Sequence, residues 1–244
     1  MRSVCFFMVY HRRPNVTRMA IDHMADVIRL FRQEGLDAEG IVIGNSKPIA
    51  RFCRELEITH LDFPNDPISN KLTYAWLMAV QSDNDYMCWL GSNNLHGDGY
   101  WALAIEKIKG HKVATFGTRN CVIISADPEN ERTCLFHPKE GYLISSGQFF
   151  LTYSFRQAVN VLTVYDLDQQ FNFDGKILDC FTDMWGSQIV EELTFDEEDC
   201  LDIKTDYNIH SFESYIGLYP EYVQSRLIAP RFPRLKMLMS GYYN

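Results

Sequence analysis

The chain has 244 residues, of which 46% are hydrophobic and 14% aromatic, enough to bury a sizeable core in one α/β domain. Its formal net charge of −9 excludes a surface that grips nucleic acid all over, although it leaves room for a local basic groove. Seven cysteines without a Cys-x-x-Cys pair exclude a zinc knuckle and a disulfide framework, and they favour small buried core residues.

Short strands and helices alternate through the first half of the chain. Residues 1–10 form an apolar run that predicts a buried strand at 3–10; the run is too short for a membrane helix and shows no cleavage site, so we expect a cytoplasmic protein without a membrane span. Helical spacing predicts a helix at 15–34, on whose apolar face we interpret His23 as a packed residue and not a ligand. The same criteria predict a strand at 38–43, a helix at 48–56 and a strand at 58–63. This order is typical of a mostly parallel sheet flanked by helices.

The stretch at 67–101 predicts the functional edge of that sheet. Asn70-Lys71 opens a helix, and the five apolar residues at 86–90 predict a strand buried on both faces. A short polar loop follows, Ser92-Asn93-Asn94. Because ligands of open α/β sheets collect beyond the carboxyl ends of the strands, we expect a binding site at this loop.

The second half of the chain predicts mixed strand pairing. A helix is expected at 98–107 with Trp101 facing inward, and Asp98 serves it as a cap or is a ligand. Strands at 113–116 and 121–125 and a charged turn at 127–132 predict a hairpin. A helix from Phe149 to about residue 158, a solvated acidic loop at 191–202 and a last strand at 200–205 complete the expected elements.

The Asn70-Lys71 pair and the polar loop after the central strand resemble the donor half of nucleotide-sugar glycosyltransferases with the GT-A fold, in particular the family 2 type and its phage-encoded relatives. The resemblance implies one Rossmann-like α/β domain at 1–215, with a nucleotide-sugar half at 1–110 and an acceptor half at 111–215. A basic, aromatic tail at 216–244 would pack on it. The family holds a divalent metal with Asp-x-Asp, where this chain has amides at Asn93 and Asn94. An amide is a weaker ligand than a carboxylate, so we expect weak binding of manganese or magnesium.

The resemblance also implies site residues. Those expected to bind the nucleotide sugar, most simply a UDP-sugar, are Tyr10, His11, Arg12, Asn70, Lys71, Ser92, Asn93, Asn94 and Lys204. The acceptor is expected at Ser145, Ser146, Gly147 and Gln148. The weak metal site would use Asn94 and His210.

The turn Asn172-Phe173-Asp174-Gly175 resembles the family turn that carries the acceptor-side base. An inverting transfer needs one carboxylate beside the attacking hydroxyl, and Asp174 is our candidate. A helix N-cap is the alternative role of Asp174. Asp179 and Asp183, one helical turn apart, are the reserves for the base.

Three functions follow from these residues. The first is a glycosyltransferase acting on a hydroxyl acceptor, either a hydroxymethylated pyrimidine in phage DNA, which the basic tail favours and the net charge opposes, or a glycan. The second is a nucleotide- or DNA-binding module without turnover, which the amides at the metal loop favour. The third is a nucleotidyltransferase, whose glycine-rich basic loop after the first strand is missing from His11-Arg12-Arg13.

Overall fold

The computed structural model describes residues 1–64, 71, 74–75, 77–78, 81–110, 115–118, 121–125, 133–136, 146–154, 156, 190–192, 200–204 and 232–243. The described strands are β1 (Ser3–Val9), β2 (Asp37–Gly44), β3 (Thr59–Asp62), β4 (Tyr86–Gly91), β5 (Asn94–His96), β6 (Thr115–Gly117), β7 (Cys121–Ser125), β8 (Thr133–Phe136), β9 (Gln148–Leu151), β10 (Val190–Glu192) and β11 (Cys200–Lys204). The described helices are α1 (Pro14–Gln33), α2 (Lys47–Glu55), α4 (Asp98–Gly110) and α9 (Pro233–Met239).

The larger sheet has seven strands in the order β10-β6-β9-β4-β1-β2-β3. Its pairs β4-β1, β1-β2, β2-β3 and β10-β6 are parallel, and β9 alone runs antiparallel, between β4 and β6. A smaller sheet joins β5, β11, β7 and β8, and β7 and β8 form the predicted hairpin. The predicted α/β fold with a mixed, mostly parallel sheet is therefore confirmed.

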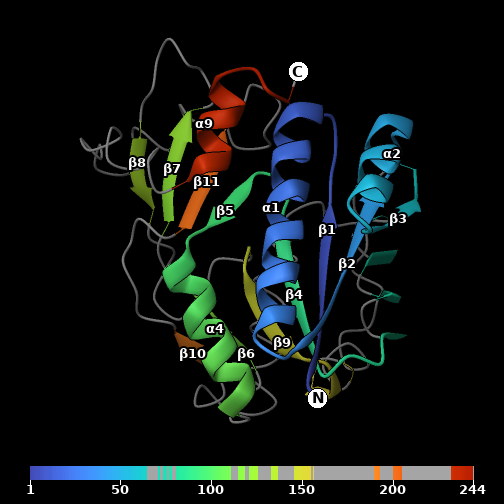
Figure 1. Cartoon of the computed structure of the whole chain (residues 1–244), viewed down its shortest axis with the longest axis vertical. Coiled ribbons are helices and arrows are strands. Elements are labelled where there is room, and N and C mark those ends of the chain that lie inside the picture. Colours follow the sequence, from blue (N-terminus) through green and yellow to red (C-terminus); the bar gives the residue numbers. More distant parts are fainter. Residues whose placement is uncertain are drawn as a thin grey trace.

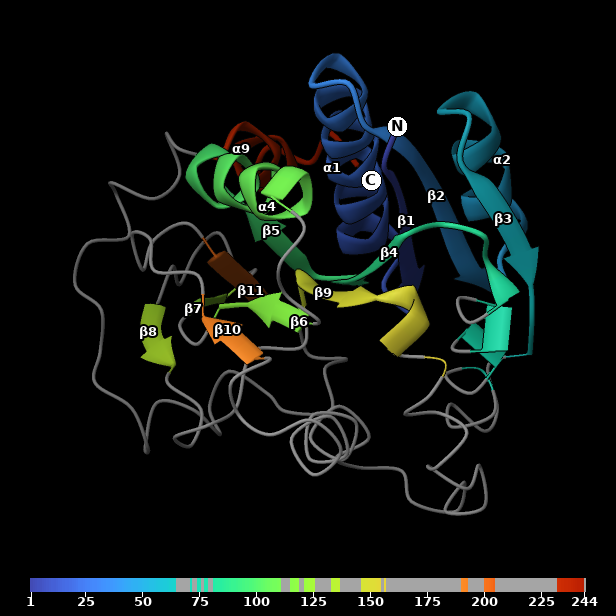
Figure 2. The same cartoon turned by 90° about the horizontal axis from the view of Figure 1, so that it is seen from below.

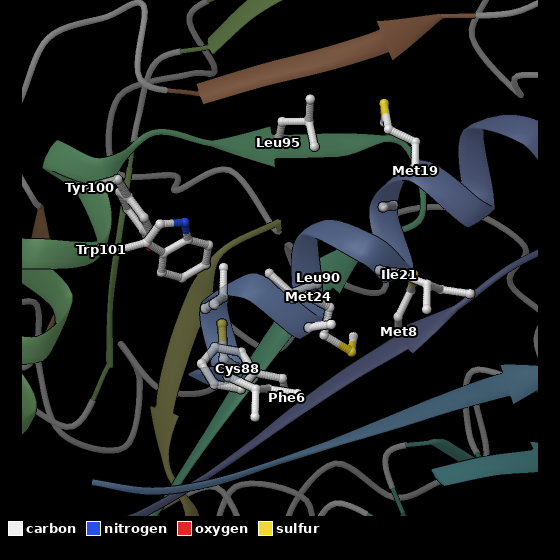
Figure 3. Close-up of a cluster of buried hydrophobic side chains, with 14 of the residues drawn as sticks. Phe6, Met8, Met19, Ile21, Met24, Cys88, Leu90, Leu95, Tyr100 and Trp101 are labelled. Atoms are coloured by element: carbon white, nitrogen blue, oxygen red, sulfur yellow. The ribbon is translucent and has the colours of Figure 1, made fainter. Parts of the chain in front are cut away.

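The helices α1, α2, α4 and α9 lie together on one side of the strands (Figure 2). Helix α1 turns an apolar face to β1 and β4, and the side chains of Met24, Phe6 and Cys88 gather between them (Figure 3). Trp101 enters the same core from α4 and meets Phe6 edge to face, with ring centroids 6.1 Å apart. Trp101 thus faces inward as the sequence predicted. The six described cysteines are also buried and free, as predicted.

Two predicted elements differ in the structure. The helix predicted from Phe149 begins later, because Phe149 is fully buried and pairs in β9 with both β4 and β6, and the described helical residues of this stretch start at Thr152. The acidic stretch at 191–202 is no single solvated loop, because its first residues pair in β10 and Asp202 lies within β11. The predicted polar loop after β4 also turns back at once into a further strand, β5, which begins at Asn94.

Helix α9 is tied to α1 by charged side chains. Arg234 donates from Nε to Asp26 Oδ2 at 3.0 Å and also bonds Asp22. Tyr243 donates its hydroxyl to Asp22 at 2.9 Å. We call these four residues the α1–α9 clasp. Within the part of the chain that the structure describes, no helix is both long and apolar enough to cross a membrane.

Candidate functional site

The parallel strands β1 and β4 end side by side, with Val9 opposite Gly91. In Figure 1, β1 starts beside the N-terminus mark and its carboxyl end leads into α1. Tyr10 and Ser92 are therefore the first residues beyond two neighbouring strands. This is the edge at which the ligands of open α/β sheets bind, and most of the described donor-site predictions fall on it.

Lys71 lies fully buried beside Tyr10. Its Nζ donates to the carbonyl oxygen of Tyr10 at 2.5 Å and lies 5.8 Å from the centre of the Tyr10 ring. Burial lowers the pKa of Lys71 to about 8, because the charged form loses its hydration. The Tyr10 hydroxyl in turn lies 3.0 Å from Nε2 of His60, on β3. The structure therefore brings together two of the predicted donor residues, Tyr10 and Lys71.

The turn between β1 and α1 directs an arginine at the polar loop. Arg12 has a φ of +49°, a conformation that non-glycine residues rarely adopt, and its side chain is exposed. The next side chain, Arg13, donates from Nη2 to the Ser92 hydroxyl at 2.9 Å. Burial lowers the pKa of Arg13, while the nearby Asp202 carboxylate opposes this shift. A strained backbone such as that of Arg12 is often found at functional sites.

Asp202 connects the polar loop to Lys204. The amide Nδ2 of Asn93 donates to Asp202 Oδ1 at 2.5 Å and to the Ile203 carbonyl at 3.0 Å. The other carboxylate oxygen, Oδ2, lies 2.6 Å from Lys204 Nζ. The side chains of Lys204 and Asp202 are only 8% and 18% exposed, so their charges are poorly screened by water. One carboxylate thus holds a lysine and an amide side by side.

We call Tyr10, Arg13, Lys71, Ser92, Asn93, Asp202 and Lys204 the edge cluster. It contains three basic side chains and one carboxylate, so its net charge is positive whether or not Lys71 is protonated. A positive, largely buried cluster at the carboxyl ends of parallel strands is suited to an anion such as a diphosphate.

The described residues do not fit the expected metal. Asn94 donates from Nδ2 to the Leu201 carbonyl at 3.3 Å, and a Cβ at Gly91 would come within 1.9 Å of Asn94 Oδ1. The Asn94 amide is thus packed against backbone. Both oxygens of Asp202 are engaged, and the described residues hold no group of three His, Cys, Asp or Glu side chains that could bind a metal ion.

The described acceptor residues join β9 to the rest of the fold. Ser146 is buried and its hydroxyl accepts from the Gly91 N–H at 3.0 Å. Gln148 is also buried and donates to the Thr115 hydroxyl at 3.1 Å. The Gly147 N–H donates to the Trp89 carbonyl at 2.6 Å. These contacts give the three residues a structural role, and their part in binding an acceptor stays a prediction.

Several predicted site residues fall outside the described residues. They are Asn70, Ser145, Asp174, Asp179, Asp183 and His210. His11 is described and lies next to Tyr10, at the start of the turn.

Sequence reasoning missed Arg13 and Asp202 as members of the cluster. Arg13 was part of the basic run after the first strand, but only the structure shows which of its side chains turns to the loop. Asp202 carried a readable signal, because Asp202 and Lys204 are two residues apart in a strand and therefore share one face.

Comparison with models of known protein families gives no match, and neither does comparison with curated protein sequences. Among solved structures, one similar chain is a candidate glucose-1-phosphate thymidylyltransferase from Bacillus anthracis in complex with a sucrose. It superposes with a TM-score of 0.45 at 11% identity, over 79% of this chain and 87% of that chain. A likeness at this level says nothing about the reaction or the ligand of the present chain.

Proposed function

We propose that the chain is a nucleotide-sugar-dependent glycosyltransferase of GT-A type that moves a sugar to a hydroxyl acceptor. One observation supports this most directly: Arg13 and Lys204 lie near the carboxylate of Asp202, and Lys71 lies buried against Tyr10 at the end of β1. The positive charge and the N–H donors of these side chains would bind the phosphate groups of a nucleoside diphosphate.

The proposed reaction breaks the bond between the sugar's anomeric carbon and the diphosphate oxygen and forms a bond from that carbon to the acceptor oxygen. Negative charge grows on the leaving diphosphate, where Arg13 and Lys204 would neutralise it. The acceptor hydroxyl gives its proton to a carboxylate, for which Asp174 is the candidate from the sequence. Attack from the face opposite the leaving group would invert the anomeric centre.

Basic side chains take the charge-balancing role in this proposal. Asp202 already bonds Asn93 and Lys204, and a cation that claimed its oxygens would have to break both contacts. We therefore expect that a chelator leaves most of the activity intact.

The test is a panel of nucleotide sugars, followed by release of the nucleoside diphosphate, with manganese and with chelator. Thermal unfolding with UDP alone is measured in parallel, because a ligand that binds only the folded state raises the midpoint. Lys204→Met should lose this stabilisation. Lys109→Met is the matched control, since that lysine is exposed and pairs with Glu34 on the surface. No stabilisation by any nucleoside diphosphate or its sugar would refute the proposal.

A second candidate is a nucleotide-binding module without turnover, which the amides of Asn93 and Asn94 at the expected metal position favour. Midpoint shifts with UDP but no release from any sugar donor would select it. The acceptor is addressed separately, by offering hydroxymethylated DNA and simple glycans to an active preparation.

A further inference from the structure

A pocket of about 790 Å³ lies between α1, the start of α4 and the start of α9. Its walls include His23, Asp26 and Leu30 from α1, Asp98 from α4, and Phe232 and Arg234 from the α9 end. On α1, His23 is ten residues and therefore roughly 15 Å from Arg13, whereas the pocket wall formed by Leu95 is two residues from Asn93 of the edge cluster. Its volume falls in the range of small-molecule sites.

The charges that α1 and α9 contribute to the pocket walls are already paired. Arg234 gives Nε and Nη2 to Asp26, at 3.0 and 2.6 Å, and its other terminal nitrogen to Asp22. Asp26 also forms an ion pair with Arg29. Two carboxylates and two guanidinium groups therefore balance. A ligand carboxylate or phosphate would have to displace Asp26 or Asp22 from Arg234.

His23 carries no charge in this wall. Its Nε2 lies 3.2 Å from the backbone N–H of His96 and accepts from it, so the proton of the neutral ring is on Nδ1. Burial and the neighbouring His96 lower the pKa of His23 to about 3. The ring is therefore a neutral hydrogen-bond donor at physiological pH.

The opposite wall of the pocket, at the start of α4, supplies a hydrogen-bond acceptor. Asp98 is exposed in the first turn of α4, and its carboxylate makes no hydrogen bond or ion pair to the residues that the structure describes. The positive end of the helix dipole offsets part of its charge, and the first N–H groups of α4 add donors. Leu30 and Phe232 contribute apolar surface.

We infer that this pocket binds a neutral polyhydroxylated ligand, a mono- or oligosaccharide. Its hydroxyls would use the Asp98 carboxylate as acceptor and the His23 ring and α4 amides as donors, while its ring carbons lie against Leu30 and Phe232. An anion would face the carboxylates of Asp98 and Asp26 and is disfavoured. The charge of Asp98, which would attract a cation, is offset in part by the positive end of α4, and this favours a neutral ligand. The inference is independent of the proposed reaction, because it concerns a separate pocket and no nucleotide.

The test is saturation-transfer NMR and thermal unfolding with neutral hexoses and disaccharides, without nucleotide. Glucosamine, glucose 6-phosphate and an amino-acid mixture are the charged and zwitterionic comparisons. Asp98→Asn should weaken sugar binding about tenfold or more, the usual loss of a hydrogen bond to a charged group. Leu30→Trp should weaken binding by narrowing the pocket beside Phe232. Glu106→Gln is the matched control, since it removes an exposed carboxylate from the same helix outside the pocket.

Three outcomes would overturn the inference: no sugar of the panel binds, only the charged or zwitterionic compounds bind, or sugar affinity is the same in Asp98→Asn as in Glu106→Gln. Stabilisation by UDP would be unaffected by any of them. Failure here is thus distinguishable from failure of the proposed nucleotide site.

Discussion

Replacing Lys71 by Met tests whether the charge of this buried lysine of the edge cluster lowers the free energy of unfolding. The pKa of about 8 in the folded protein lies below the ordinary 10.5, so the folded state holds this proton less readily than the unfolded chain. The burial penalty is fully present below about pH 8 and has vanished above about pH 10.5, and stability therefore rises with pH across this window. Between about pH 7 and about pH 10 the gain is roughly 2.5 kcal/mol.

The assay is urea unfolding of the wild type and of Lys71→Met at several pH values in this window. Subtracting the two free energies of unfolding cancels the titration of all groups that they share. The difference should rise by about 2 to 3 kcal/mol in favour of the wild type as the pH increases. At neutral pH Met avoids the burial cost but loses the bond to the Tyr10 carbonyl, so only the slope is diagnostic. Parallel curves would show that Lys71 titrates like a surface lysine and would refute the reasoning.

The same lysine gives a binding signature. A nucleoside diphosphate beside Nζ would restore the ordinary pKa of Lys71, so binding of UDP at about pH 8.5 should take up roughly 0.7 proton. Calorimetry in buffers of different ionisation enthalpy measures this uptake. Proton uptake that is equal in the wild type and in Lys71→Met would place the diphosphate away from Lys71.

Three further predictions concern single residues. Lys204→Met should weaken binding of UDP about tenfold to a hundredfold, measured by calorimetry, because a charge-assisted bond is lost; unchanged affinity would remove Lys204 from the diphosphate site. Asp174→Asn should lower turnover about a hundredfold to ten-thousandfold with donor binding retained, whereas near-normal turnover would assign Asp174 to a helix cap. Gly44→Ala should lower stability by about 1 to 3 kcal/mol, since the added Cβ would lie 2.3 Å from the Tyr10 ring, and Tyr10→Ala in the same chain should relieve that loss.

The strands and helices of the first half could be predicted because their signal is local. Runs of apolar residues mark β1, β2 and β4, and helical spacing marks α1. A short apolar run such as that at Phe149 fits a strand or a helix equally well, and pairing with β4 and β6 decided between them. Local pattern alone contains no such information.

The candidate site divides in the same way. The strand ends after β1 and β4 were visible in the sequence, and with them Tyr10 and Ser92. The setting of Asp202 was hidden, because its partner Asn93 lies 109 positions away and the surrounding acidic residues suggested a solvated loop. Burial of Lys71 was equally unreadable, since lysine is rarely buried and only the packed fold shows its contact with Tyr10.

The α1–α9 clasp has a consequence for the order of folding. It joins side chains 212 and 221 positions apart, Asp22 with Arg234 and with Tyr243. A helix of seven residues such as α9 is unstable by itself in water, so it gains its structure from docking. Docking requires α1 to be already formed and held on its sheet. We therefore expect α9 to be among the last elements to fold during synthesis and among the first to detach when the protein is pulled mechanically. Protection of its backbone amides from hydrogen exchange would then report that folding is complete.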